Sequence, residues 1–203
     1  MQKYFSKLYD YFSHVLFYFS IGLYRVLPGN FHRVILLDVD LKFTDDISKL
    51  YDRFKLFTDD NIIGIGREMQ PVYRTLFTQY RNDHNGTRVG DPPPHGLPGF
   101  NSGVLLLDLD RMRDSKLYNS QLAEESLARL TGEFTFDGYL GDQDFYTLLG
   151  MKYPQLFHRL PCGWNRQLCR SKRRTGEEHI FDQYHRCDEE VKIYHGNCHA
   201  KFP

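Results

Sequence analysis

The sequence predicts an α/β fold with a mostly parallel central sheet. Short apolar runs alternate with helix-like stretches, which is the arrangement of strands joined by helical crossovers. Two of these runs, Val34–Leu37 and Val104–Leu107, contain only Val, Ile and Leu, as expected of strands buried on both faces. At 203 residues the chain is long enough for a core of its own, so we expect a single domain over residues 1–203.

The expected elements begin with an amphipathic helix over residues 5–27, which Pro28-Gly29-Asn30 ends. A central strand follows at 33–37, and Thr44-Asp45-Asp46 should cap a helix from Ile47 to Phe57. The rest of the chain is expected to contain, in order, a strand at 62–66, a helix at 71–80, a loop at 82–99, a strand at 104–109, helices at 115–130 and 141–149, and an irregular C-terminal remainder.

Composition and charge exclude several functions. The chain carries 26 basic and 26 acidic residues and has a pI near 7.1, so nothing steers it toward nucleic acid or an anionic membrane. The apolar run from Tyr11 to Leu27 is too short and too polar to span a bilayer, and Met1 opens no convincing signal peptide. We therefore expect no nucleic-acid partner, and a membrane only through a leader absent from this chain.

Asp38 and Asp40 directly follow the strand at 33–37. Alternation along an extended chain turns both side chains to one side and Val39 to the other. Two carboxylates this close repel each other, and a divalent cation such as Mg²⁺ or Mn²⁺ relieves the repulsion and could hold a diphosphate. The alternative is that one Asp caps a turn and the other is solvated. Their position at a strand end, where α/β sheets bind ligands, favours the metal.

Three further segments carry polar side chains suited to a sugar or a metal. Asn101-Ser102-Gly103 precedes a buried strand; its asparagine can donate to and accept from a sugar hydroxyl, and its glycine permits close backbone approach. Asp142-Gln143-Asp144 opens a helix, where acids suit the helix dipole but the glutamine has no such structural reason. His195 would make a third metal ligand. An ordinary turn, a helix terminus and a structural histidine are the alternatives.

Taken together and in this order, these segments closely resemble the glycogenin-like family of retaining glycosyltransferases, family eight. A finer similarity, to family members that add xylose to a xylose–glucose disaccharide on EGF-like repeats, is carried by Arg67–Arg74, Gly96–Gly103, Trp164–Cys169 and Val191–Cys198. Phosphatases of the haloacid dehalogenase type also begin with a hydrophobic strand and Asp-x-Asp. Their pattern places a hydroxyl where this chain has Lys42, so we set that alternative aside.

The resemblance implies a Rossmann-like nucleotide-sugar transferase fold of the GT-A type. It implies that Asp38, Asp40 and His195 bind Mn²⁺, with Mg²⁺ as the alternative, and that the metal bridges the diphosphate of UDP. The residues implied to bind the donor are Asn101, Ser102, Gly103, Asp142, Gln143, Gly196 and Lys201. Of these, Asp142 would accept hydrogen bonds from sugar hydroxyls and Gln143 would lie near the anomeric carbon, which makes them the expected catalytic residues.

The resemblance also implies the reaction. Xylose would pass with retention from UDP-xylose to the xylose–glucose disaccharide O-linked to EGF-like repeats of Notch-type substrates. Because Gln143 is a poor nucleophile, a front-face path through an ion-pair-like state is expected. A glucose or galactose donor and a non-catalytic fragment are the alternatives, since one CH₂OH group separates the sugars. The implied location of the full-length protein is the endoplasmic reticulum lumen or membrane, in the secretory pathway.

Two features depart from the family pattern. The family begins with a strand and loop that hold uridine well before Asp-x-Asp, whereas this chain has room there for one helix, so we expect a truncated N-terminus. The family ends in His-x-x-Gly-x-x-Lys-Pro-Trp. Here Lys201 keeps its spacing from His195, Cys198 replaces the glycine, and Phe202-Pro203 replaces Pro-Trp.

For the acceptor we expect Trp164 and the loop at 84–99 to form the binding surface. An exposed indole would offer a flat face to a sugar ring, and acceptors approach over loops beyond the strand ends. Core packing of Trp164 is the alternative.

All four cysteines lie in the last quarter of the chain and lack the Cys-x₂-Cys spacing of a structural zinc site. Two disulfides and an oxidising compartment are therefore expected, and the sequon at Asn85 agrees with that compartment. Of three possible connectivities we expect Cys169–Cys198, which would anchor the His195 loop, together with Cys162–Cys187. Four free thiols are the alternative.

Overall fold

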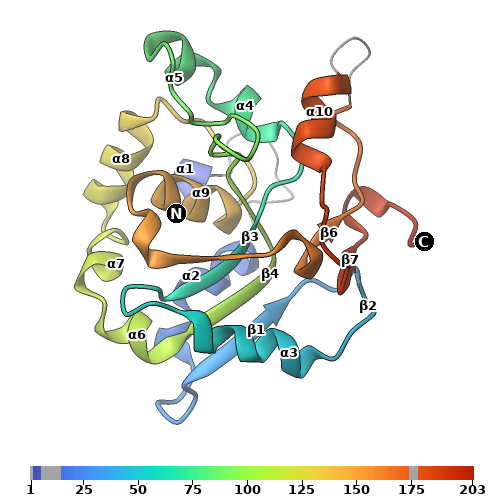
Figure 1. Cartoon of the computed structure of the whole chain (residues 1–203). Coiled ribbons are helices and arrows are strands. Elements are labelled where there is room, and N and C mark those ends of the chain that lie inside the picture. Colours follow the sequence, from blue (N-terminus) through green and yellow to red (C-terminus); the bar gives the residue numbers. More distant parts are fainter. Residues whose placement is uncertain (1, 6–14, 174–177) are drawn as a thin grey trace.

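The computed structural model describes residues 2–5, 15–173 and 178–203, and its centre is a four-stranded sheet in the order β1–β4–β3–β5 (Figure 1). A second, three-stranded sheet has the order β2–β7–β6. The strands are β1 (Arg33–Leu37), β2 (Leu41–Phe43), β3 (Ile63–Arg67), β4 (Phe100–Asp108), β5 (Phe157–Leu160), β6 (Arg166–Gln167) and β7 (Ile193–His195).

Three strands of the four-stranded sheet share one direction, and β4 runs against them. β1 and β3 each pair antiparallel with β4, whereas β5 pairs parallel with β3. The prediction of a mostly parallel sheet is therefore right for the direction of β1, β3 and β5 and wrong for their pairing, because the reversed strand lies between two of them. An apolar run indicates that a strand is buried, whereas the connections between strands decide their order.

The central strand is β4. Its residues 103–108 are buried, whereas residues 34–37 of β1 are only half-buried and pair with β4 alone among the described strands. The prediction of a central, fully buried strand at 33–37 is therefore wrong. Four consecutive aliphatic residues show that both faces of a strand are apolar, but they do not show how many neighbours the strand has.

Side chains of β4 alternate between two hydrophobic cores. Leu105 and Leu107 pack into the core that the helices cover, and Val104 and Leu106 pack into a second core on the other face. This period of two is the consequence of an extended backbone. Both faces of β4 are therefore packed close to the edge of the sheet at which the candidate site lies.

The helices gather mainly on one side of the four-stranded sheet, where Figure 1 shows α2 and α6 to α9, with α4, α5 and α10 beyond one edge. Their bounds are α1 (Gln2–Phe5), η2 (Val15–Tyr18), α2 (Phe19–Val26), α3 (Ile47–Tyr51), η3 (Asp52–Leu56), α4 (Val72–Leu76), α5 (Thr78–Asp83), α6 (Leu109–Asp114), α7 (Lys116–Ser120), α8 (Glu124–Glu133), α9 (Asp142–Lys152), η4 (Pro154–Leu156), η5 (Cys162–Trp164), α10 (Glu178–His185) and η6 (Asn197–His199). Among the described residues, no helix is long and apolar enough to cross a membrane.

The predicted helices are present, but the breaks within several of them were not predicted. Of the helix expected at 5–27, residues 6–14 lie outside the described part, and the rest forms η2 and α2, which ends before Pro28 as predicted. Asp46 caps α3 by accepting a hydrogen bond from the Ser48 amide at 2.8 Å, also as predicted. The helices expected at 47–57, 71–80 and 115–130 are each divided in two, because hydrophobic periodicity locates a helical face better than a break.

The C-terminal segment is less irregular than predicted. It is linked by disulfides as expected, but it also contains β5, β6, β7 and α10. Strands of two to four residues are too short to show an alternating pattern in the sequence.

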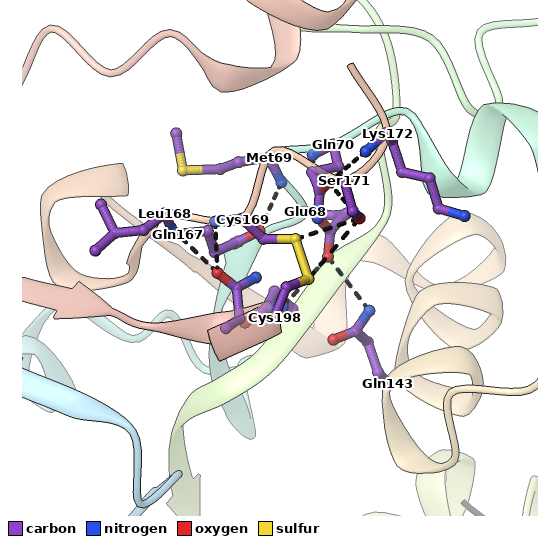
Figure 2. The surroundings of a disulfide bond; sticks show 12 residues. Glu68, Met69, Gln70, Gln143, Gln167, Leu168, Cys169, Ser171, Lys172 and Cys198 are labelled. Atoms are coloured by element: carbon purple, nitrogen blue, oxygen red, sulfur yellow. Dashed lines mark hydrogen bonds between the residues drawn. A yellow bond between two sulfur atoms is a disulfide. The ribbon is translucent and has the colours of Figure 1, made fainter. Parts of the chain in front are cut away.

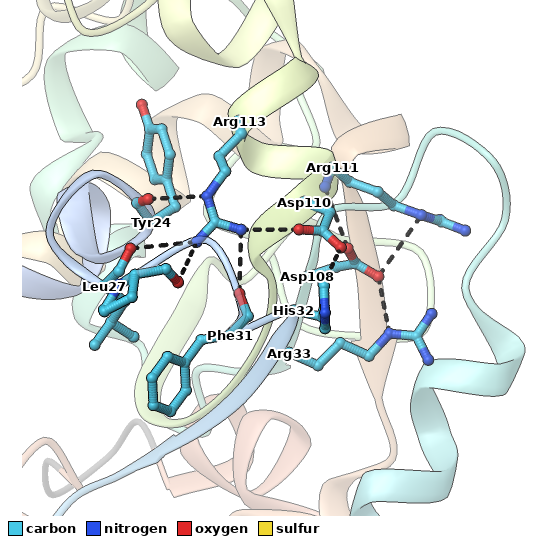
Figure 3. A network of polar contacts seen from close by, with 10 residues as sticks. Tyr24, Leu27, Phe31, His32, Arg33, Asp108, Asp110, Arg111 and Arg113 are labelled. Carbon is cyan, nitrogen blue, oxygen red and sulfur yellow. Dashed lines mark hydrogen bonds and ion pairs between the residues drawn. The ribbon is translucent and has the colours of Figure 1, made fainter.

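A network of charged side chains holds the end of the sheet opposite the candidate site (Figure 3). Asp108 is buried at the end of β4 and accepts a hydrogen bond from Arg33 Nε at 3.0 Å. Arg33 is the first residue of β1 and lies opposite Asp108 in the strand pairing. Arg113 donates to the carbonyl oxygens of Tyr24 and Phe31 at 3.2 and 3.1 Å. The turn after α2 is thereby fastened to α6.

Candidate functional site

Polar side chains from several elements meet at one edge of the four-stranded sheet. Because β4 runs against β1 and β3, the start of β4 lies beside the ends of those two strands. Asp38 follows β1, Glu68 follows β3, and Asn101 lies at the start of β4. The N-terminus of α9 reaches this edge from the helical side, and His195 reaches it from the three-stranded sheet. The edge is the one at which open α/β sheets bind ligands.

Asp38, Asp40 and His195 form a cluster of potential metal ligands, with one ligand atom of each within 4.8 Å of the others. His195 Nε2 lies 3.5 Å from a carboxylate oxygen of Asp38 and 3.3 Å from one of Asp40. The Val39 side chain between the two acids is fully exposed, and it lies in a bend rather than in the extended strand that the alternation assumed. Two carboxylates and one imidazole are a donor set that suits Mn²⁺ or Mg²⁺, so the residues present fit a divalent cation.

The backbone around this cluster is fixed by both sheets. Residues 38–40 connect β1 to β2, and thus pass from one sheet to the other. The Asp38 amide donates to Gly103 O at 2.9 Å, and the Gly196 amide donates to Asp40 O at 2.8 Å. The carboxylate side chains of Asp38 and Asp40 are 55% and 45% exposed, whereas the His195 side chain is 4% exposed. Both carboxylates are therefore accessible to a ligand from solvent. The buried imidazole would contact that ligand from the protein interior.

Gly103 permits the close approach that the sequence suggested, and the group that approaches it is the imidazole of His195. A Cβ at this position would lie 2.3 Å from His195 Cε1 and 3.0 Å from an Asp38 carboxylate oxygen. No side chain larger than hydrogen fits without displacing the ligand cluster.

Two amides that were expected at the donor sugar lie beside the metal cluster and share one partner. Asn101 Nδ2 and Gln143 Nε2 donate to the same carboxylate oxygen of Glu68, at 3.2 and 3.3 Å. Figure 2 shows Gln143 pointing toward Glu68. Glu68 is 3% exposed, and burial raises its pKa to about 7.

The sequence reasoning missed Glu68, although a signal existed. Like Asp38, it directly follows a short buried strand, and an acid at that position is a ligand-site candidate by the same rule.

Asp142 faces the site from the first turn of α9. Its carboxylate accepts hydrogen bonds from Ser102 Oγ at 3.0 Å and from Ser20 Oγ at 2.5 Å. Burial raises its pKa to about 6. Ser20, on α2, was not predicted, and nothing in its local sequence marks it.

Asp144 has a structural role. It is fully buried, accepts from the Tyr73 hydroxyl at 2.9 Å and from the Leu140 amide at 2.6 Å, and burial raises its pKa to about 7.

The acceptor prediction for Trp164 is wrong in its premise. The indole is 4% exposed and packs in the second core with Leu160 and Ile193, so it offers no free face to a sugar. A single tryptophan after an irregular stretch carries no sequence signal that separates a surface from a core position. The loop at 84–99 follows α5, and residues 93, 94 and 96–99 line a hollow together with Arg67 and Met151.

The two remaining donor candidates lie at the C-terminal end. Gly196 is buried beside His195, whereas Lys201 is exposed on the tail that follows η6.

Both predicted disulfides are confirmed. Cys162 is bonded to Cys187 and Cys169 to Cys198. The second bridge lies close to the candidate site (Figure 2), and Asn197 reinforces it, because its side-chain oxygen accepts from the amides of Leu168 and Cys169 at 3.1 and 2.9 Å.

The chain is similar in sequence to proteins of one family. Residues 2–202 match the model described as Glycosyl transferase family 8. Over its full length the chain is 50% identical to xyloside xylosyltransferase 1 of Mus musculus and of Homo sapiens, and it spans 52% of each, about half the length of these curated relatives. It is 31% identical to xylosyl- and glucuronyltransferase LARGE1 of Homo sapiens, over 90% of this chain and 22% of that protein.

Solved structures show the same fold. The crystal structure of mouse xyloside xylosyltransferase 1 in its apo form matches with a TM-score of 0.96 at 50% identity, over 100% of this chain and 70% of that one. Galactosyltransferase LgtC in complex with donor and acceptor sugar analogs matches with a TM-score of 0.54 at 19% identity, over 90% and 58% of the two chains, and shows likeness of fold alone. The predicted fold of the GT-A type is thereby confirmed.

Proposed function

The chain belongs to glycosyltransferase family 8, and from that premise we propose that it transfers xylose from UDP-xylose, with Mn²⁺ as cofactor, to a xylose–glucose disaccharide O-linked to EGF-like repeats. The observation that carries the proposal is the convergence of Asp38, Asp40 and His195 beside the amides of Asn101 and Gln143. The 50% identity to xyloside xylosyltransferase 1 over the whole chain supports xylose as the sugar.

Asp38, Asp40 and His195 would hold the metal. Mn²⁺, when bound, would supply positive charge that stabilises the leaving diphosphate. Of these three side chains, His195 has the least conformational freedom, because it is buried and its backbone pairs with β2 and β6.

Asp142 and Gln143 would act on the sugar. The Asp142 carboxylate already accepts from Ser20 and Ser102, and a carboxylate has further lone pairs to accept from a sugar hydroxyl. Gln143 Nε2 is tied to Glu68, and its Oε1 accepts from the Ser102 amide at 3.3 Å. A second lone pair on that oxygen would face positive charge developing at the anomeric carbon, while the amide is too weak a nucleophile to form a stable bond. This arrangement suits retention by a front-face path.

The rival proposal is a non-catalytic fragment, and a glucose or galactose donor is the other alternative. The chain spans about half the length of the curated relatives it matches. The three proposed metal ligands would not discriminate between sugars, because they would act on the diphosphate that all three donors share.

For the full-length protein we propose the endoplasmic reticulum lumen or membrane. Two disulfides with no free cysteine among the described residues support an oxidising compartment. The loop at 84–99 is our proposed acceptor surface, since Trp164 is buried and this loop lines the hollow beside the start of β4.

UDP binding with and without Mn²⁺, measured by calorimetry, tests the proposal first. Metal-dependent binding followed by xylose transfer to a synthetic xylose–glucose disaccharide is the expected result, with UDP-glucose and UDP-galactose as competing donors. Absence of metal-dependent UDP binding by this chain, with activity in a longer product of the same gene, would support the fragment instead. Faster transfer from UDP-glucose would overturn the choice of sugar.

A further inference from the structure

Four buried polar side chains form a continuous chain of hydrogen bonds that ends at the back of the metal cluster. Glu68, Asn101, Asn165 and His195 are 3%, 6%, 1% and 3% exposed. Asn101 Nδ2 lies 3.2 Å from Glu68 Oε2, Asn165 Nδ2 lies 2.8 Å from Asn101 Oδ1, and His195 Nδ1 lies 3.0 Å from Asn165 Oδ1. Buried amides are costly unless they are hydrogen-bonded, and here each one bonds to the next.

A backbone amide fixes the direction of this chain. The Gly103 N–H, which can only donate, lies 3.2 Å from Asn101 Oδ1. Asn101 must therefore turn its oxygen toward Gly103 and its nitrogen toward Glu68. That same oxygen accepts from Asn165 Nδ2, so Asn165 presents its own oxygen to His195. The orientation of both amides follows from one unambiguous donor.

The orientation of Asn165 determines where the proton of His195 lies. An amide oxygen carries no hydrogen, so the 3.0 Å contact requires His195 Nδ1 to donate. A neutral imidazole has one N–H, and Nε2 is then left with a free lone pair. Nε2 is the atom that faces Asp38 and Asp40, at 3.5 and 3.3 Å.

We propose that Glu68, Asn101 and Asn165 are positioning residues that hold His195 as its Nδ1–H tautomer, with the Nε2 lone pair directed at the cation site. Carboxylates or amides behind a metal-binding histidine orient the ring in this way. The inference rests on the proposed metal site for its purpose, whereas the tautomer itself is a property of the metal-free chain. Asn165 is the last link: it hydrogen-bonds His195 but is not itself one of the three potential metal ligands.

Glycines make room for the two groups that meet at the last link. A Cβ on Gly66 would lie 3.3 Å from Asn165 Cβ, and a Cβ on Gly103 would lie 2.7 Å from His195 Nδ1. Asn165 and His195 are thus packed closely from both strands, β3 and β4, which leaves the ring little freedom to turn over.

Glu68 joins this chain to the sugar side of the site. Its Oε2 accepts from Gln143 as well as from Asn101, and its Oε1 accepts from the Gln70 amide at 3.0 Å. One buried carboxylate therefore orients the metal-binding imidazole, through two amides, and the amide proposed at the anomeric carbon.

The tautomer is measured first, on metal-free protein labelled with ¹⁵N-histidine, by long-range ¹H–¹⁵N correlation in the pH range over which the spectrum itself shows a neutral His195 ring. The His195 signals are assigned by their loss in His195→Gln. We expect the Nδ1–H pattern in the wild type and its loss in Asn165→Leu. The matched control is Asn61→Leu. Asn61 is also a buried amide with two hydrogen bonds, from the Thr58 amide and to Gln155 O at 2.9 and 2.8 Å, and it lies at the opposite end of β3.

Mn²⁺ affinity, measured by electron paramagnetic resonance of the free ion, is the second readout. Asn165→Leu should weaken binding by about 10- to 100-fold, as is typical when the partner of a metal-binding histidine is lost, while Asn61→Leu keeps the wild-type affinity.

An Nε2–H pattern in the wild type, or Asn165→Leu with the affinity of Asn61→Leu, would overturn the proposal. A wild-type Nδ1–H tautomer that Asn165→Leu abolishes, in a chain without Mn²⁺ affinity, would support the positioning chain and count against the proposed metal function alone.

Discussion

The imidazole of His195 lies directly over Gly103, where a Cβ would come within 2.3 Å of Cε1. Gly103→Ala should therefore displace the ring and weaken Mn²⁺ binding at least tenfold, about 1.4 kcal/mol or more. Calorimetric titration with Mn²⁺ measures the effect. Gly132→Ala is the control, because a Cβ there meets nothing within 4 Å in helix α8, and the change should leave metal binding unaltered. Equal affinities in the two variants would show that His195 is not a ligand.

Asp38→Asn and Asp40→Asn each remove one charge at nearly constant shape. Each change should weaken Mn²⁺ binding at least tenfold, about 1.4 kcal/mol or more, because an amide oxygen is a poorer ligand for a hard cation than a carboxylate. Asp59→Asn, an exposed acid before β3, should bind Mn²⁺ like the wild type. Wild-type affinity in both site variants would mean that this cluster is not a metal site.

Gln143→Ala should separate metal binding from transfer. Its side-chain hydrogen bonds go to Glu68 and to the Ser102 amide, so the affinities for Mn²⁺ and UDP should stay within about twofold, while the transfer rate falls by at least about tenfold. Isothermal titration and the disaccharide transfer assay measure the two effects. A variant that transfers xylose at the wild-type rate would remove Gln143 from the catalytic residues.

The buried acid Asp144 should make stability depend on pH. Burial raises its pKa from 3.8 to about 7, so the folded chain keeps a proton that the unfolded chain has lost. Its contribution to stability is full below 3.8 and is lost as the pH rises toward 7, with a slope of about 1.4 kcal/mol per pH unit. Asp144→Asn stays neutral, and its amide accepts from Leu140 and donates to the Tyr73 hydroxyl.

Urea unfolding of wild type and Asp144→Asn between about pH 4.5 and pH 7 measures that difference. The variant should show a flatter dependence of unfolding free energy on pH, whereas Asp59→Asn should keep the wild-type slope. Parallel curves for wild type and Asp144→Asn would show that the Asp144 carboxyl is already ionised in the folded chain.

The two disulfides form a matched pair for a test of the His195 loop. They span 25 and 29 residues, so chain entropy predicts about 3.5 kcal/mol of stabilisation from each. Removing Cys169–Cys198 by paired Ala substitutions should lower Mn²⁺ affinity severalfold, because Cys198 anchors the segment just after His195. Removing Cys162–Cys187 should lower Tm by a similar amount and leave Mn²⁺ affinity close to wild type. Equal losses of affinity in both variants would mean that the bridges affect the site only through general stability.

Much of the candidate site could be predicted because its signals are local. Asp38 and Asp40 are two residues apart directly after an aliphatic strand, so the local sequence alone places two carboxylates at the end of that strand. The cap at Asp46 and the confinement of the cysteines to one segment are local in the same sense. Gln143 is a local signal as well, because an amide has no structural reason to begin a helix.

Other features depend on which segments pack together, and no local pattern records them. β4 was recognisable as a buried strand, but its reversed direction between β1 and β3 follows from the whole sheet. Trp164 was expected at the surface, and it is buried because a second core of Leu50, Phe54 and Ile193 covers it. Ser20 reaches Asp142 from 122 residues away.

The sequence by itself determined the donor atoms of the proposed cation site: two carboxylates and a histidine of suitable chemistry. Only the tertiary structure decided which ring nitrogen of His195 faces the proposed cation site. That orientation depends on a chain of hydrogen bonds through Glu68, Asn101 and Asn165, whose successive members are 33, 64 and 30 positions apart in the sequence. A hydrogen bond between side chains requires a fixed distance and direction. Residues so distant in the chain acquire both only when β3, β4 and the segment after η5 are packed side by side.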